Sequence, residues 1–259
     1  MNIFKQFIKS LYSPKDMATF RFQGIGKSIL YVFFLVLLTS IPAFVFVGTG
    51  TYQIFNATKT VVDADVPNFI IEDGEFTAET DEPVFIEQDD VTIIIDPNNE
   101  LTLSEINNYG DVIAIQQYEL VFVMGGQEDF FNFADLQGFT LTRDDIVSFM
   151  DGLGSLMPII LTLILIVMYV AFSAVKFIQV TILGLVGLII KNSLDRTNLK
   201  YRHTWILAAY AVTIPTILFT LTDLLGLYIP ATGIISFAAS IFVLYLIIKE
   251  VKVKKTVEQ

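Results

Sequence analysis

The chain has 259 residues, of which 54% are hydrophobic and 17% charged, and its formal net charge is −11. Soluble globular proteins are about one quarter charged, so this balance argues against an ordinary cytosolic enzyme. The 23 Phe and 10 Tyr residues argue against a disordered chain. Because the sequence has no cysteine and one histidine, it excludes disulfides, thiol nucleophiles and metal sites built from several histidines.

The charges are segregated along the sequence. Residues 49–151 contain 22 acidic and two basic residues, whereas the rest of the chain contains five acidic and 14 basic residues. Long apolar segments flank the acidic block on both sides. This asymmetry predicts that a membrane separates two parts of the chain that lie in different environments.

Residues 1–27 are predicted to form a basic, amphipathic, cytoplasmic segment that contains a short helix ending before Pro14. Two interpretations of this helix are open. It lies on the anionic inner leaflet of the membrane, or it packs against the protein's own helical bundle. The apolar face of the helix consists of Phe4, Phe7, Ile8, Leu11 and Tyr12.

Residues 28–48 are predicted to form the first transmembrane helix, because they carry no formal charge and are long enough to cross a hydrocarbon core of about 30 Å. Five basic residues precede this segment and favour a cytoplasmic N-terminus. The length of the preceding segment argues against a cleaved signal peptide. We therefore expect a signal anchor, with a kink at Pro42.

Residues 49–153 are predicted to form an acidic extracytoplasmic α+β domain that is mostly β-strand. Asp73-Gly74 is typical of a type I′ hairpin turn, and Asp89-Asp90 is predicted to be a second hairpin tip. Thr102 and Glu105 have the spacing of a capping box, and Thr142 is expected to cap the helix that leads into the next span. The predicted strands are residues 68–72, 75–79, 84–87, 91–95, 112–116, 119–124 and 130–133.

The apolar segment 154–190 allows two topologies. If it is one crossing with a bent or re-entrant continuation, 14 basic residues lie inside and two outside; if it is two helices, the numbers are six and ten. The positive-inside rule therefore favours one crossing here and four in total. The absence of Gly and Pro between Ile159 and Leu183 agrees, since a hairpin needs turn residues. Five crossings remain the alternative.

The remaining residues complete an α-helical integral membrane protein with an inserted, mostly β, extracytoplasmic α+β domain. We expect it to cross the plasma membrane several times. The last predicted segments are a basic cytoplasmic loop at 191–203, a transmembrane helix at 204–222, a short outer loop at 223–230, a transmembrane helix at 231–248 and a basic cytoplasmic tail at 249–259.

No catalytic or cofactor-binding motif occurs, so we expect no enzyme activity, cofactor, metal or nucleic acid. Asp96 to Glu100 lacks the loop glycine and distal Glu of a calcium-binding hand and is predicted to be a solvated turn. His203 is expected to be an interfacial residue. Polar or helix-breaking residues within spans are functional candidates by default. The candidates are Lys176, Tyr210, Pro215 and Asp223.

The predicted topology places Lys176 and Asp223 at opposite membrane interfaces. Lys176 is then a snorkelling anchor at the inner interface, and Asp223 is a residue of the outer loop. Tyr210 and Pro215 lie in a span that is rich in threonine. Hydroxyl groups in such helices pack and form interhelical hydrogen bonds, or they line a substrate path.

Several motifs together resemble a known family. They are Leu11-Tyr12-Ser13-Pro14-Lys15-Asp16, Phe20-Arg21-Phe22-Gln23, Pro67-Asn68-Phe69, Ile94-Ile95-Asp96-Pro97, Lys176-Phe177-Ile178-Gln179, Ala209-Tyr210-Ala211 and Lys249-Glu250. The chain resembles a domain-of-unknown-function family of integral membrane proteins from Gram-positive bacteria, some members of which are named maltodextrin utilization protein. The family is distantly similar to Yip1-type membrane proteins, a similarity that implies five spans.

The resemblance implies a Gram-positive host and an accessory role beside a sugar importer. A sugar site would be expected to present an aromatic platform, but we expect Phe130, Phe131 and Phe133 to lie in a core strand instead. The leading expectation is a non-enzymatic accessory, sensing or organising partner of envelope or carbohydrate (maltodextrin) uptake systems. Its partners would be membrane lipids and other membrane proteins such as a sugar importer. The alternative is a small membrane transporter or channel component.

Overall fold

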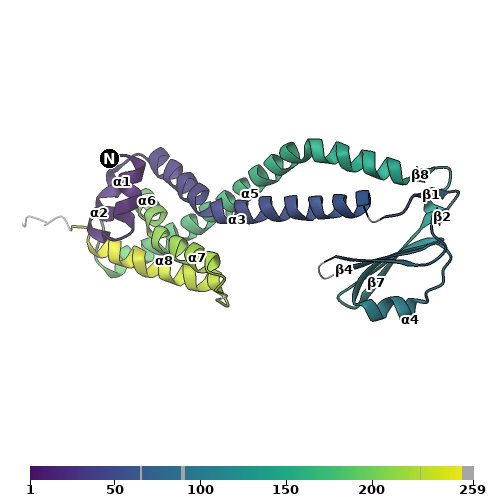
Figure 1. The fold of residues 1–259 in the computed structure, drawn as a ribbon. Coiled ribbons are helices and arrows are strands. Elements are labelled where there is room, and N and C mark those ends of the chain that lie inside the picture. Colours follow the sequence, from purple (N-terminus) through teal and green to yellow (C-terminus); the bar gives the residue numbers. More distant parts are fainter. Residues whose placement is uncertain (65, 89–90, 228, 253–259) are drawn as a thin grey trace, which may run out of the picture. The chain divides into compact units, whose positions relative to one another are not determined.

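The computed structural model describes residues 1–64, 66–88, 91–227 and 229–252 (Figure 1). The chain divides into two compact units. One, here the helical unit, comprises Met1–Gly48 and Leu161–Gln259, and the other, here the sheet unit, comprises Thr49–Ile160.

The helical unit contains two short N-terminal helices and parts of four longer helical segments. The bounds of the elements that contribute to it are α1 Ile3–Ser10, α2 Pro14–Thr19, the 3₁₀ helix η1 Phe20–Phe22, α3 Ile25–Ala64, α5 Arg143–Ser193, α6 Tyr201–Ala211, α7 Thr213–Leu224 and α8 Thr232–Lys249.

Four helical segments in the described residues are long and apolar enough to cross a membrane. They are Ile25–Asp63, Arg143–Ser193, Tyr201–Leu224 and Thr232–Lys249. The third segment differs from the single predicted helix at 204–222, because α6 ends at Ala211 and α7 begins at Thr213. Pro215 accounts for this division, since it has no N–H with which to bond the carbonyl of Ala211.

Helix α3 continues past the predicted end of the first span at Gly48 and passes through Pro42 to reach Ala64. Helix α5 is longer still: it runs without interruption over 51 residues and contains the whole of the apolar segment 154–190. The alternative hairpin of two helices is therefore absent from α5. At 1.5 Å per residue this helix extends for about 76 Å.

Two glycines of α5 allow it to pack closely against α6. A Cβ atom at Gly187 would lie 2.9 Å from Cβ of Thr204, and one at Gly184 would lie 3.2 Å from Cα of Trp205. The side chain of Thr204 donates a hydrogen bond of 2.8 Å to the carbonyl of Gly184. Small residues thus let the two backbones approach, as is common between helices in membranes.

The sheet unit contains two β-sheets. The strands are β1 Phe69–Glu72, β2 Glu75–Ala78, β3 Val84–Gln88, β4 Val91–Asp96, β5 Asp111–Gln116, β6 Glu119–Met124, β7 Gln127–Asn132 and β8 Leu141–Thr142. The smaller sheet has the order β2-β1-β8, and the larger has the order β3-β4-β5-β6-β7. Strands β4 and β5 are parallel and their crossover contains helix α4, Leu103–Ile106, and the 3₁₀ helix η2, Asn107–Tyr109; the other pairs are antiparallel.

Local sequence signals account for much of this unit. Asp73 and Gly74 both have positive φ angles, as a type I′ turn requires, and Thr102 and Glu105 form the predicted capping box. Thr142 accepts a hydrogen bond from the backbone N–H of Asp145 at the start of α5. The second predicted hairpin tip, Asp89-Asp90, lies outside the described residues.

The structure corrects one expectation about the sheet unit and refines another. The last long strand, β7, is exposed along its whole length, with Phe130 and Phe131 52% and 41% exposed, whereas Phe133 is 3% exposed and follows the strand. The strand lies at the edge of its sheet, so it has no second neighbour to cover it. The predicted turn from Asp96 to Glu100 is present, and its residues Asn98, Asn99 and Glu100 are exposed. The carboxylate of Asp96 itself is buried, and it accepts hydrogen bonds from the backbone N–H groups of Glu100 and Leu101.

Arg143 joins the two helical ends of the sheet unit. Its guanidinium donates to the carbonyl oxygens of Val62, Asp63 and Val66. The last carbonyls of a helix have no partner within it, so a cation that donates several hydrogen bonds is well suited to this position. Val61 of α3 is itself buried in the core between the sheets.

Candidate functional site

A pocket in the helical unit with several polar lining residues lies between α5, α7 and α8 and has a volume of about 390 Å³. Its polar lining comes from three helices, and its apolar lining includes Val175, Phe219 and Phe237. The polar lining residues are Lys176 and Gln179 of α5, Thr216, Thr220 and Asp223 of α7, and Thr232 and Ser236 of α8.

Helical spacing explains why these side chains converge. Thr216, Thr220 and Asp223 are separated by four and three residues, so they lie along one face of α7. Lys176 and Gln179 are likewise three residues apart on α5. Helix α8 begins at Thr232 and presents its first turn to the same pocket.

Lys176 is held in the pocket by two neutral oxygen atoms. Its Nζ donates to Oε1 of Gln179 at 2.9 Å and to Oγ1 of Thr216 at 3.1 Å. The Thr216 hydroxyl in turn donates to the carbonyl of Val212 at 2.6 Å. Asp223 lines the same pocket but forms no ion pair with Lys176, since the ion pairs of the described residues are Lys9–Asp16 and Lys59–Asp151.

The predicted separation of Lys176 and Asp223 is therefore wrong. Opposite interfaces would be about 30 Å apart, whereas both residues line one pocket. Lys176 of α5 lies beside Thr216 of α7, and Asp223 follows Thr216 along the same face of α7.

The helical unit also has a closely packed apolar core. Beyond Thr216, toward the start of α6, the residues from Ile206 to Val212 are fully buried. Leu244, Ile247 and Ile248 of α8 belong to the same buried core. None of these buried residues is among those that line the pocket.

Tyr210 belongs to a second polar cluster, formed with the N-terminal segment. The Tyr210 hydroxyl donates to Oε1 of Gln6 at 3.1 Å and accepts from Nε2 of Gln23 at 2.5 Å. Gln6 donates to Gln23, and Gln23 also donates to Ser28. Side chains of the N-terminal segment, of the start of α3 and of α6 thus satisfy one another inside the helical unit.

This cluster also decides how α1 is oriented. Gln6 is 2% exposed and Ser10 is fully buried, so the polar side of α1 faces the bundle, while Phe4, Ile8 and Tyr12 are exposed. The interpretation that α1 packs against its own bundle is therefore confirmed. Its exposed apolar side chains keep the interpretation of a membrane-surface helix open.

The other candidates and motifs have structural roles in the described residues. Pro215 is buried in α7 and does not line the pocket. His203 accepts a hydrogen bond at Nδ1 from the backbone N–H of Lys200 and so caps the start of α6. No group of acidic or histidine side chains in the described part of the chain could hold a metal ion.

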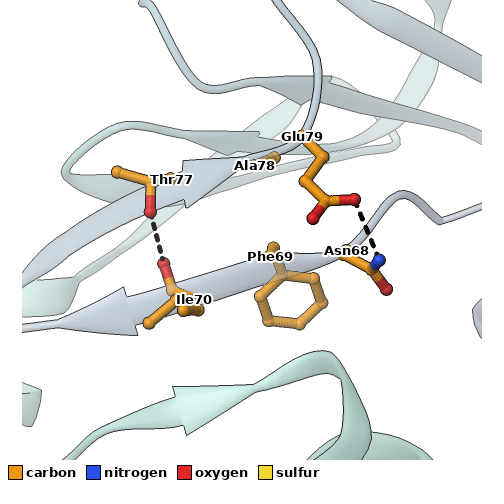
Figure 2. Close-up of a pocket in the computed structure, with 6 residues that line it drawn as sticks. All are labelled: Asn68, Phe69, Ile70, Thr77, Ala78 and Glu79. Carbon is orange, nitrogen blue, oxygen red and sulfur yellow. Dashed lines mark hydrogen bonds between the residues drawn. The ribbon is translucent and has the colours of Figure 1, made fainter.

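Two pockets of the sheet unit differ in character. The shallow one in Figure 2 lies on the β1–β2 hairpin, where Asn68 donates to Glu79 and Thr77 donates to the carbonyl of Ile70. These polar groups bond one another. The other pocket, of about 290 Å³, lies between the sheets and is lined by apolar side chains such as Phe76, Phe131 and Phe133.

Sequence reasoning missed Gln6 and Gln23 as partners of Tyr210. The one available signal was a glutamine inside an otherwise apolar or basic helix, next to Phe7. It also missed the convergence of Lys176 and Asp223, since nothing in the residue spacing aligns α5 with α7.

Comparison with known proteins gives a family and no named relative. No curated protein and no solved structure matches the chain. The model of a family described as "Protein of unknown function (DUF1189)" matches residues 4–248. Because this match covers nearly the whole sequence, the chain belongs to that family of unknown function.

Proposed function

We propose that this protein is a non-enzymatic membrane protein that acts as an accessory, sensing or organising partner of envelope or carbohydrate uptake systems. The proposal places it in the plasma membrane of a Gram-positive bacterium, with a cytoplasmic N-terminus and residues 49–153 outside. The distribution of basic residues supports this orientation. We also propose that the protein takes part in maltodextrin utilization and that it is distantly related to Yip1-type membrane proteins.

The observation that carries the proposal is the polar pocket around Lys176. Its lining brings one lysine, one carboxylate and several neutral amide and hydroxyl groups together beside apolar side chains. A site that binds a small molecule is what a sensing or accessory subunit needs. The small number of hydrogen-bonding side chains in an otherwise apolar surrounding is typical of small-molecule sites.

Strand β7 is the proposed contact surface for a partner protein. It lies at the sheet edge, so the backbone groups on its outer side are not used within the sheet. All six of its residues are exposed, including two phenylalanines. Exposed sheet edges bind extended segments of other proteins by adding a strand.

Photo-crosslinking in living cells tests the partner role. A photoreactive amino acid at Phe130 or Phe131 should repeatedly capture the same envelope or transport protein, whereas the same probe at the buried Phe133 should capture none. Capture of only a second copy of this chain, or equal capture from all three positions, would contradict the proposal.

A small transporter is the second candidate function. The line of Thr216, Thr220 and Asp223 along α7, next to Lys176, favours it, since ionisable and hydroxyl groups line many substrate paths. Purified protein in liposomes would then move a solute or charge at a rate that falls in K176M. A flux equal to that of empty liposomes would favour the accessory role.

A further inference from the structure

The ligand class of the Lys176 pocket follows from its charges. Lys176 contributes a full positive charge inside a helix that is apolar enough to span a membrane, and its two hydrogen-bond partners there are neutral. Burying a cation without a counter-charge is costly, so such a residue gains from a bound anion. No described side chain supplies that anion within ion-pair distance.

The start of α8 adds a second positive potential to the same pocket. Helix α8 has 18 residues, no acidic residue in its first turn and an N-cap, Ala231, whose side chain cannot accept a hydrogen bond. The first backbone N–H groups of a helix have no partner within it and carry partial positive charge. Thr232 and Gly233 both line the pocket, and a Cβ atom at Gly233 would meet nothing within 4 Å.

The surroundings of the pocket favour a lipid over a soluble ion. Val175 lines it and is 66% exposed, so one rim is an apolar surface of a candidate membrane span. Phe219 and Phe237 extend the apolar lining beside the polar groups. A headgroup phosphate would suit Lys176 and the start of α8, while its acyl chains would lie along the exposed apolar helix surface.

Asp223 sets the charge selectivity. Its carboxylate is exposed and lines the pocket seven residues beyond Thr216, about 10 Å along α7. It repels a second negative charge on the ligand. A ligand with one phosphate and no further negative charge therefore fits this arrangement best.

We propose that the pocket between α5, α7 and α8 binds the phosphate of an anionic phospholipid, with Lys176 and the first N–H groups of α8 as its ligands. The inference rests on the proposed function only in treating this pocket as a binding site. Failure of the crosslinking test at β7 would leave it intact, and loss of lipid binding would not alter partner capture.

Native mass spectrometry of the full-length protein in detergent tests the inference. Phosphatidylglycerol is the probe, phosphatidylcholine is the headgroup control and inorganic phosphate is the soluble control. We expect phosphatidylglycerol to bind at least tenfold more weakly to K176Q than to the wild type, and to bind K176R as it binds the wild type. K15Q, which removes an exposed lysine of α2, should change binding less than twofold.

Two substitutions at Gly233 distinguish the contribution of the α8 N–H groups to lipid binding from that of Lys176. G233P removes one backbone N–H at a position in the first helical turn that tolerates proline, whereas G233A keeps that N–H. Phosphatidylglycerol should bind severalfold more weakly to G233P and unchanged to G233A. Both variants keep all charges, so a change in overall charge cannot produce the difference.

Three results would overturn the inference. Equal binding to the wild type and K176Q, with the unfolding temperature of K176Q unchanged, would show that the lysine is not a ligand. If inorganic phosphate displaced phosphatidylglycerol at a concentration equal to that of the lipid, the ligand would be a soluble anion. Weaker binding of phosphatidylglycerol to D223N, where we expect equal or tighter binding, would show that the carboxylate holds the ligand and that a zwitterion fits better.

Discussion

The hydroxyl of Tyr31 lies 2.7 Å from Oγ1 of Thr213, although 182 residues separate them in the sequence. This contact joins α3 to the first residue of α7 and lies between the two polar features of the bundle. Tyr210, three residues earlier, bonds the N-terminal segment, and Thr216, three residues later, bonds Lys176. The N-terminal cluster and the lysine pocket are thus attached to consecutive turns of one helical segment.

Replacing Tyr210 by phenylalanine should destabilise the helical unit. Y210F removes the hydroxyl that bonds Gln6 and Gln23, so Oε1 of the buried Gln6 loses the donor that Tyr210 provides. Such a loss costs about 1–3 kcal/mol. Thermal unfolding in detergent measures it, with Y245F, at a partly exposed tyrosine, as the control. Equal unfolding temperatures for the two variants would contradict the role of the cluster.

Arg143 should be needed for the end of α3. R143K keeps the charge but lacks the planar group that reaches the carbonyls of Val62, Asp63 and Val66 together. We expect the amides of residues 58–63 to exchange hydrogen faster in R143K, and faster still in R143A. Exchange rates in R143K that equal those of the wild type would show that charge alone stabilises this end.

The capping box at Thr102 gives a pH dependence with a defined sign. Hydrogen bonds from the backbone N–H and the hydroxyl of Thr102 lower the pKa of Glu105 below its ordinary value. A lowered folded-state pKa means that the box stabilises α4 above the ordinary pKa and that this stabilisation is lost as the pH falls through the folded-state value. NMR titration of Glu105 should show the lowered pKa.

The variant T102A is the control for that titration, because it keeps Glu105 and removes the hydroxyl. The pKa of Glu105 should rise toward its ordinary value in T102A, and the amides of α4 should exchange faster at neutral pH. An unchanged pKa in T102A would show that the hydroxyl contributes nothing to the shift.

Short-range signals in the sequence predicted the strands and turns of the sheet unit. The burial or exposure of particular side chains was not predicted, because it depends on packing between residues that are far apart in the sequence. The hairpin at Asp73-Gly74 and the capping box at Thr102 each depend on residues within a few positions. The exposure of Phe130 depends on β7 being an edge strand, which alternation of side chains cannot reveal. Burial of Asp96 likewise depends on Gln116, twenty residues away, which donates to its carboxylate.

The candidate site likewise depends on long-range packing that the sequence does not reveal. Lys176 and Asp223 were identifiable as ionisable residues in or near apolar segments, and both line the pocket. Their proximity required knowing which residues of α5 lie beside which residues of α7. That alignment is set by Gly184 and Gly187 against α6, a contact between residues about twenty positions apart that hydropathy cannot reveal.

Gly187 should therefore tolerate no side chain. The Cβ atom of G187A would lie 2.9 Å from Cβ of Thr204, 3.3 Å from its Cγ2 and 3.4 Å from Cδ2 of Leu244. A threonine Cβ cannot move without its backbone, so α5 and α6 must separate. Inserting a carbon into a closely packed contact costs about 1–3 kcal/mol, and we expect a lower unfolding temperature in detergent.

Gly50 provides the matched control for this substitution. It also lies inside a long helix, α3, but a Cβ atom there meets nothing within 4 Å. Alanine is favoured over glycine inside a helix by up to about 1 kcal/mol, so G50A should unfold at the same or a higher temperature while G187A unfolds at a lower one. The two substitutions should thus change the unfolding temperature in opposite directions, whereas helix propensity alone would stabilise both variants. If G187A were as stable as G50A, the close approach of α5 to α6 at Thr204 would be wrong, and with it the alignment that brings Lys176 beside Thr216.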